Sequence, residues 1–145
     1  TGSCRTGRLA DMNPVSAIAM SGLNAATLRL QASAGNIANA RSNGPLAGAA
    51  NPSGQPSVYT PLGVVQTPRA DGGVEASLAP ASRDALLTYD PSASYANSEG
   101  MVATPDVNLV DDMIELVTAR YAFAANLAVL RTDADMQDAA LGLKA

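Results

Sequence analysis

The segment LVDDMIELVTARYAFAANLAVLRTDADMQDAAL, residues 109–141, decides the fold that this sequence predicts. Its stripe positions recur at intervals of three and four, and the segment contains no glycine or proline. This spacing lines one face of a helix with apolar side chains, and such a face is stable only against another helix. The stripe consists of Leu109, Met113, Leu116, Phe123, Leu127, Leu130, Ala134 and Leu141, with Arg120 and Gln137 at its polar positions.

A second segment with the same spacing lies near the other end of the chain, over residues 14–40. Asn13 is a favourable N-cap and Pro14 is tolerated at the first helical position, so a helix is expected to begin there. The sequence RSNGP at residues 41–45 is a strong terminator. The stripe of this helix consists of Met20, Leu23, Leu30, Ala34 and Ile37, with Thr27 at the skipped position.

The region between the two helices has a different composition. Residues 44–105 hold 8 of the 9 prolines and 7 of the 12 glycines, which excludes helix over most of this stretch. The turn signal Asp71-Gly72-Gly73 favours a small β-hairpin between two short strands. Strands are expected at residues 57–60, 62–66 and 73–78, and residues 81–87 are expected to form one helical turn or a strand. The whole region is expected to be an extended arm, loosely ordered unless it packs on a partner.

These segments predict a mainly α fold in which the N- and C-terminal helices pair as an antiparallel coiled coil. The helices, residues 12–43 and 106–145, form one discontinuous domain in this interpretation, and residues 44–105 form the Gly/Pro-rich arm with its hairpin. Asp106 or Asn108 is expected to cap the second helix. Residues 1–11 are interpreted as a disordered native tail or as a non-native extension ahead of Met12.

Composition argues against several classes of function. The net charge of −4 and the scattered arginines provide no basic stripe for nucleic acid. No uninterrupted apolar run approaches the ~18 residues of a membrane span. Cys4 is the single cysteine, which excludes an internal disulfide. Residues 1–11 lack the apolar core of a signal peptide.

The acidic residues do not suggest a catalytic or metal site. Asp111, Asp112, Asp133, Asp135 and Asp138 are expected to form solvated acidic faces, because the chain has no histidine and one cysteine to complete a ligand set. A Ser-His nucleophile is impossible for the same reason, whereas a lysine-based variant is not strictly excluded. The sequence therefore predicts no enzyme, no cofactor and no small-molecule substrate.

Three asparagines and two glycines leave alternatives open. Asn36 and Asn39 share a helix face and either form hydrogen bonds between subunits or serve local capping. Asn126 is next to the stripe and either fixes the register of the helix pair or lies solvated on its flank. Gly22 and Gly35 either admit a close neighbouring backbone or simply weaken the first helix.

Four segments, taken in order, resemble the bacterial flagellar basal-body rod family. Two are the SGLNA of residues 21–25 with the SAGNIANA of residues 33–40, and the DVNLVDDM of residues 106–113. The third is the spacing of Asn126, Thr132 and Met136. The fourth, residues 89–93 and 100–102 leading into 106–108, is similar to the proximal rod protein C type in particular. Residues 44–70 match poorly, and Gly35, Tyr121 and Phe123 depart from the family pattern.

This resemblance implies a structural subunit that polymerises through its terminal helices into the axial drive shaft crossing the periplasm. Its partners would be copies of itself, other rod subunits and the flagellar type III export apparatus, without a cleaved signal peptide. Another axial protein (a B-type rod or junction subunit) and a soluble helical adaptor or export-chaperone-like module are the alternatives. The assembly residues expected on this interpretation are three asparagines and most of the large stripe residues: Asn36, Asn39, Asn126, Met20, Leu23, Leu30, Ile37, Leu109, Met113, Leu116, Phe123, Leu127 and Leu130.

Overall fold

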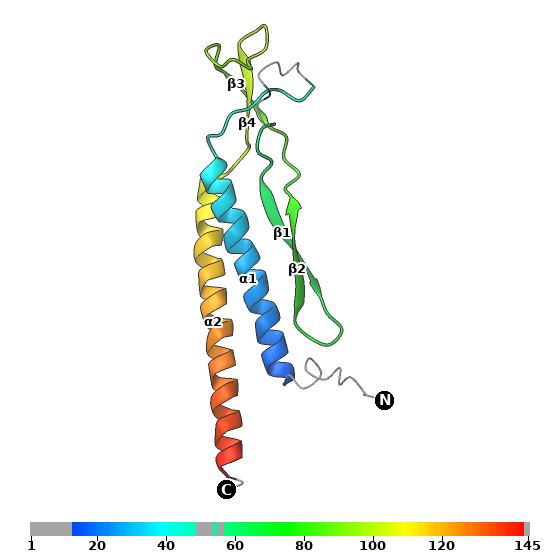
Figure 1. Cartoon of the computed structure of the whole chain (residues 1–145), viewed down its shortest axis with the longest axis vertical. Coiled ribbons are helices and arrows are strands. Elements are labelled where there is room, and N and C mark those ends of the chain that lie inside the picture. The colour runs from blue at the N-terminus through cyan, green and yellow to red at the C-terminus, as the bar shows by residue number, and fades with distance from the viewer. Residues whose placement is uncertain (1–12, 49–53, 55–56, 144–145) are drawn as a thin grey trace, which may run out of the picture.

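Two long helices lie side by side in this computed structural model, which describes residues 13–48, 54 and 57–143. A β-hairpin runs along one of the helices, and a second small sheet lies at the end of the molecule remote from the C-terminus (Figure 1). The expected extension of residues 1–11, with Cys4, falls outside the described residues. The elements in chain order are α1 (Pro14–Asn39), β1 (Leu62–Pro68), β2 (Val74–Pro80), β3 (Leu86–Tyr89), β4 (Met101–Thr104) and α2 (Leu109–Gly142).

The predicted helix starts are confirmed by their caps. The Asn13 side chain accepts a hydrogen bond from the Val15 N–H at 3.2 Å, with Pro14 at the first helical position. Of the two caps considered for α2, Asn108 is correct, because its Oδ1 accepts from the N–H groups of Val110 and Asp111. Within the described residues, α1 ends at Asn39 rather than at residue 43, and α2 begins at Leu109 rather than at residue 106.

The two helices run antiparallel and touch through small side chains. Ala19 and Ala26 of α1 and Ala119 of α2 are buried. A Cβ at Gly22 would lie 2.7 Å from Cγ of Asn126, so the glycine admits α2 at close range. The expected close approach at Gly22 is present, but the nearest atoms belong to a side chain of α2 and not to its backbone. The supercoiling of the two helices as a coiled coil stays a prediction. That they form one discontinuous domain also stays a prediction.

The predicted hairpin is confirmed. Strands β1 and β2 pair antiparallel from Leu62 opposite Pro80 to Pro68 opposite Val74. The chain reverses through Gly72 and Gly73, whose φ angles of +88° and +78° suit glycine. The expected strand at residues 57–60 is wrong, since this segment has no strand partner. It packs instead on Gly44, where an added Cβ would lie 2.7 Å from the Val58 nitrogen.

A second sheet, absent from the sequence prediction, joins β3 and β4. They pair antiparallel from Leu86 opposite Thr104 to Tyr89 opposite Met101. On the other side of β4, Gly44 and Ala103 exchange two backbone hydrogen bonds of 2.9 Å each. For residues 81–87 the strand alternative holds only from Leu86 onward, and no helical turn forms there.

The hairpin folds back along α1 of its own chain rather than projecting from it (Figure 1). The Val74 N–H donates to Ser21 Oγ at 3.1 Å near the hairpin turn, and the Leu62 backbone bonds to Asn36 at the other end. Ala25 and Ala32 of α1 are buried. Part of the expected arm is therefore ordered by contacts within the chain.

Candidate assembly surface

Polar side chains hold the helix pair at three levels, and the first is a buried aspartate. Asp133 of α2 is 2% exposed and accepts hydrogen bonds from Asn13 Nδ2 at 2.6 Å, from Gln137 Nε2 at 2.9 Å and from Ser16 Oγ. The expectation that Asp133 belongs to a solvated acidic face is therefore wrong. The start of α1 covers it and supplies two of the donors that a buried carboxylate requires.

The second level is an ion pair between Arg29 of α1 and Glu115 of α2. The guanidinium is bidentate: Nε donates to one carboxylate oxygen and Nη2 donates to the other at 3.0 Å. This hydrogen bonding lowers the pKa of the Glu115 carboxyl against the opposing effect of its partial burial, and raises the pKa of Arg29. Both groups are charged at neutral pH and cross-link the helices.

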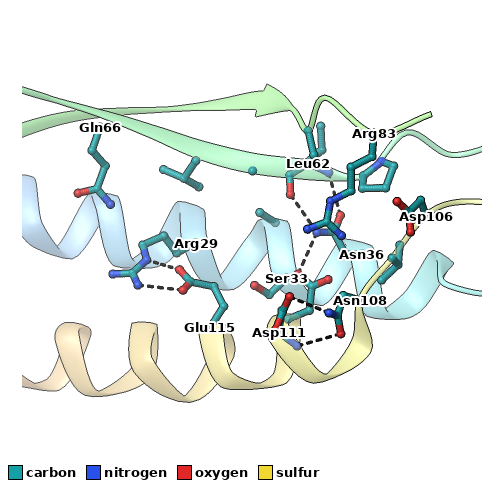
Figure 2. A pocket seen from close by; sticks show the side chains of 17 residues that line it. Arg29, Ser33, Asn36, Leu62, Gln66, Arg83, Asp106, Asn108, Asp111 and Glu115 are labelled. Atoms are coloured by element: carbon teal, nitrogen blue, oxygen red, sulfur yellow. Dashed lines mark hydrogen bonds and ion pairs between the residues drawn. The ribbon is translucent and has the colours of Figure 1, made fainter. Parts of the chain in front are cut away.

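The third level is Asn36, which ties three elements together (Figure 2). Its Nδ2 donates to the Leu62 carbonyl at 2.9 Å and to Asp112 Oδ1 at 3.0 Å, while its Oδ1 accepts from the Leu62 N–H at 2.8 Å and the Tyr59 hydroxyl at 3.1 Å. The side-chain amide therefore pairs with the edge of β1 as a strand would. Burial, and secondarily the Asp112 charge, raises the pKa of Tyr59.

The other asparagines are placed differently. Asn39 Nδ2 donates to the Gly35 carbonyl at 2.9 Å, which is a local bond. Asn126 Nδ2 donates to the Ala122 carbonyl at 2.8 Å while its side chain lies against Gly22. The bonds of Asn36 within this chain are tertiary rather than local capping, and its role between subunits stays a prediction. The register role of Asn126 stays a prediction.

The large stripe residues lie around the polar contact between α1 and α2 and not within it. On α1, Met20 is exposed, and Leu23, Leu30 and Ile37 are partly exposed. On α2, Met113 is 56% exposed, Leu109 and Phe123 are 37% and 36% exposed, and three others are partly exposed (Leu116, Leu127 and Leu130). The expected assembly residues therefore keep much of their apolar surface uncovered in the single chain.

A second exposed apolar row on α2 was missed from the sequence. Val110, Ile114, Val117 and Tyr121 recur at intervals of four, three and four, and their exposed fractions run from 54% to 71%. The sequence contains this spacing, but the prediction followed one stripe only. We call these four residues with Met113 the outward face of α2.

A cleft of about 370 Å³ opens where β1, α1 and the first turns of α2 meet (Figure 2). Its charged lining residues are Arg29, Arg83, Asp106, Asp111, Asp112 and Glu115. Within the described part of the chain, no group of three or more metal-ligating side chains is arranged to hold a metal ion. The cleft lies at the end of the helix pair where α1 finishes and α2 begins.

Known proteins similar to this chain are rod proteins. The family model described as flagellar basal body rod FlgEFG protein C-terminal matches residues 98–143. The flagellar basal-body rod protein FlgC of Agrobacterium fabrum is 34% identical over 128 residues, covering 86% of this chain and 91% of that protein. FlgC of Salmonella typhimurium is 34% identical over 119 residues, covering 79% and 84%. FlgC of Borreliella burgdorferi is 28% identical over 149 residues, covering 87% and 93%.

Proposed function

Since this chain belongs to the flagellar basal-body rod protein FlgC family and is a structural subunit of the basal-body rod, we propose that it polymerises through its terminal helices. The family predicted from the sequence is confirmed, and the alternatives of another axial protein or an adaptor are not favoured. The relatives reported above, which cover most of both chains, are all rod proteins of this name.

The observation that carries this proposal is the distribution of side chains around the helix pair. Small and polar residues make the contact within the chain, whereas the outward face of α2 and most large stripe residues stay accessible. An apolar surface of this extent marks an interaction site in a water-exposed protein. Neighbouring subunits would cover these rows and complete the core that one chain lacks.

Because of its exposed apolar rows, α2 is also long and apolar enough, by length and composition alone, to cross a membrane. The sequence prediction differs because it rests on uninterrupted apolar runs, and polar residues interrupt the apolar residues of α2. Length and composition do not distinguish a membrane span from a helix surrounded by other protein. Membership of a rod family favours protein neighbours as the covering.

The finer parts of the proposal follow from the family. The chain would occupy the proximal part of the rod in the periplasm, in contact with other rod proteins and with its own copies, and would reach this place through the flagellar type III export apparatus. It would act mechanically and not as an enzyme. A contact that repeats head to tail without closing generates a helical filament, which suits a shaft.

The test is incorporation into basal bodies. An epitope-tagged copy of this chain would replace the resident rod protein in a strain that lacks it, and basal bodies would be isolated and imaged by cryo-electron microscopy. We expect the tagged chain in the rod, with α2 packed against neighbouring helices. A soluble chain that never co-purifies with basal bodies, although it is expressed and exported, would contradict the proposal.

A further inference from the structure

Arg120 is a charged residue inside an apolar part of α2. It is exposed and forms no ion pair with any described residue. The residues three, four and seven positions away on the same helix are all apolar: Met113, Leu116, Val117, Phe123, Ala124 and Leu127. No acid on α2 can therefore reach it through the usual helical spacing.

Covering the outward face of α2 would remove Arg120 from water as well. Burying a charge without a partner is strongly unfavourable. An opposite charge on the covering molecule offsets this cost by pairing with it. The covering molecule must therefore present a carboxylate that is not already occupied, at the place where it meets Arg120.

The cleft beside β1 presents such a carboxylate. The cleft is lined by four carboxylates and two guanidinium groups, and the guanidinium of Arg29 is already paired with Glu115. Asp111 accepts from Asn108, and Asp112 accepts from Asn36. Asp106 is half-buried and bonds to none of the described residues through its side chain.

We propose that the outward face of α2 docks on a second copy of this chain, with Arg120 entering the cleft and pairing with Asp106 of that copy. This inference rests on the proposed function and names a contact within it. The cleft volume of about 370 Å³ accommodates one guanidinium side chain with water.

The pairing occurs between copies, because one chain cannot form it with itself. Arg120 lies roughly 16 Å of helical rise beyond Leu109, whereas Asp106 precedes that residue, so a side chain cannot span the gap. The two surfaces are also different patches of the molecule. When Arg120 of one copy occupies the cleft of a second copy, the first copy still has an unoccupied cleft and the second still has an unpaired Arg120. Further copies can therefore add at both ends, and an open contact of this kind builds a filament.

The experiment is a charge exchange scored by the amount of chain in isolated basal bodies. We expect Arg120→Glu and Asp106→Arg each to lower that amount by at least about tenfold, because each leaves a like-charge or unpaired contact. The double variant carrying both changes should return it to within about threefold of wild type. Arg131→Glu is the matched control, since Arg131 is an exposed arginine one helical turn from Asp135, and should incorporate normally.

Failure of the double variant to recover, with normal incorporation of Arg131→Glu and unchanged circular dichroism, would overturn the contact. A second measurement identifies the occupant: a Cys4→Ser chain carrying Arg120→Cys and Asp106→Cys is treated with a short bis-maleimide. A ladder of multiples of this chain supports the proposal, and cross-links only to a protein of different mass overturn it. Absence of the wild-type chain from basal bodies would instead defeat the proposed function itself.

Discussion

Gly22 of α1 lies directly against the side chain of Asn126 of α2, with room for a hydrogen atom but not for a methyl group. Glycine inside an exposed helix costs about 1 kcal/mol relative to alanine, so its presence here needs a packing reason. A Cβ 2.7 Å from Asn126 Cγ supplies that reason.

We expect Gly22→Leu to lower the free energy of unfolding by about 2 kcal/mol, because overfilling a packed contact forces neighbouring side chains and backbone apart. Urea unfolding followed by circular dichroism measures the change. Asn126→Ala in the same chain should recover part of the loss by making room. An unchanged unfolding midpoint for Gly22→Leu would contradict the close contact.

Asp133→Ala should destabilise the chain by about 1–3 kcal/mol, because Asn13, Ser16 and Gln137 lose the acceptor they share. Asp135→Ala is the control: this carboxylate is exposed two residues away, and its loss should change stability by no more than about 0.5 kcal/mol. Thermal unfolding of the two variants side by side decides the matter. Equal unfolding midpoints for the two variants would show that the buried carboxylate of Asp133 does not stabilise the folded chain.

The Arg29–Glu115 pair should make stability depend on pH at the acidic end. The pKa of Glu115 is lowered in the folded chain, so its contribution is present above the unfolded pKa of about 4.3 and is lost as the pH falls through the folded value. Arg29 stays charged throughout. The effect should be less than about 1 kcal/mol, since the pair is partly exposed.

Glu115→Gln removes this titration, so the difference in unfolding free energy between wild type and variant should be largest at neutral pH and shrink as the pH falls below the unfolded pKa of about 4.3. Urea unfolding measured at a series of pH values from neutral into this acidic range follows the change. A difference that stays constant over this range would mean that the stabilisation does not come from the Glu115 charge.

Val117→Asp should prevent incorporation into basal bodies while leaving the folded chain intact, because Val117 is exposed in the single chain and lies on the outward face of α2. A charge covered by a neighbour without a partner costs several kcal/mol. Leu127→Asp, on the neighbouring stripe, is expected to act in the same way. Incorporation of Val117→Asp at wild-type levels would mean that this face is not covered in the rod.

Much of the fold could be predicted because its signals are local. Asn13-Pro14 and Asn108 fix the helix starts through their own side chains, and Asp71-Gly72-Gly73 encodes the hairpin turn. Strand β4 was missed because four residues carry little periodicity, and because one of its partners is as short (β3) and the other is a single residue far away in sequence (Gly44).

The side-chain contacts were harder to foresee because helical spacing shows which residues share a face but not what lies opposite that face. The small residues Ala19, Gly22 and Ala26 follow the same spacing as the larger stripe, and only the close approach of α2 distinguishes the two rows. Burial of Asp133 depends on Asn13 and Ser16, more than a hundred positions earlier. Such pairings are set by tertiary structure.

The polar ties between α1 and α2 have a mechanical consequence for a shaft that is turned at one end and loaded at the other. Purely apolar contact is non-directional, so two helices joined by it alone can creep past one another under sustained shear. Hydrogen bonds and bidentate ion pairs, in contrast, are satisfied in one alignment only. Sliding by a single helical turn, about 5.4 Å, would break the bonds of Asn13, Arg29 and Asn36 together. Each subunit would therefore pass a twisting load along its length as a stiff element, without slipping.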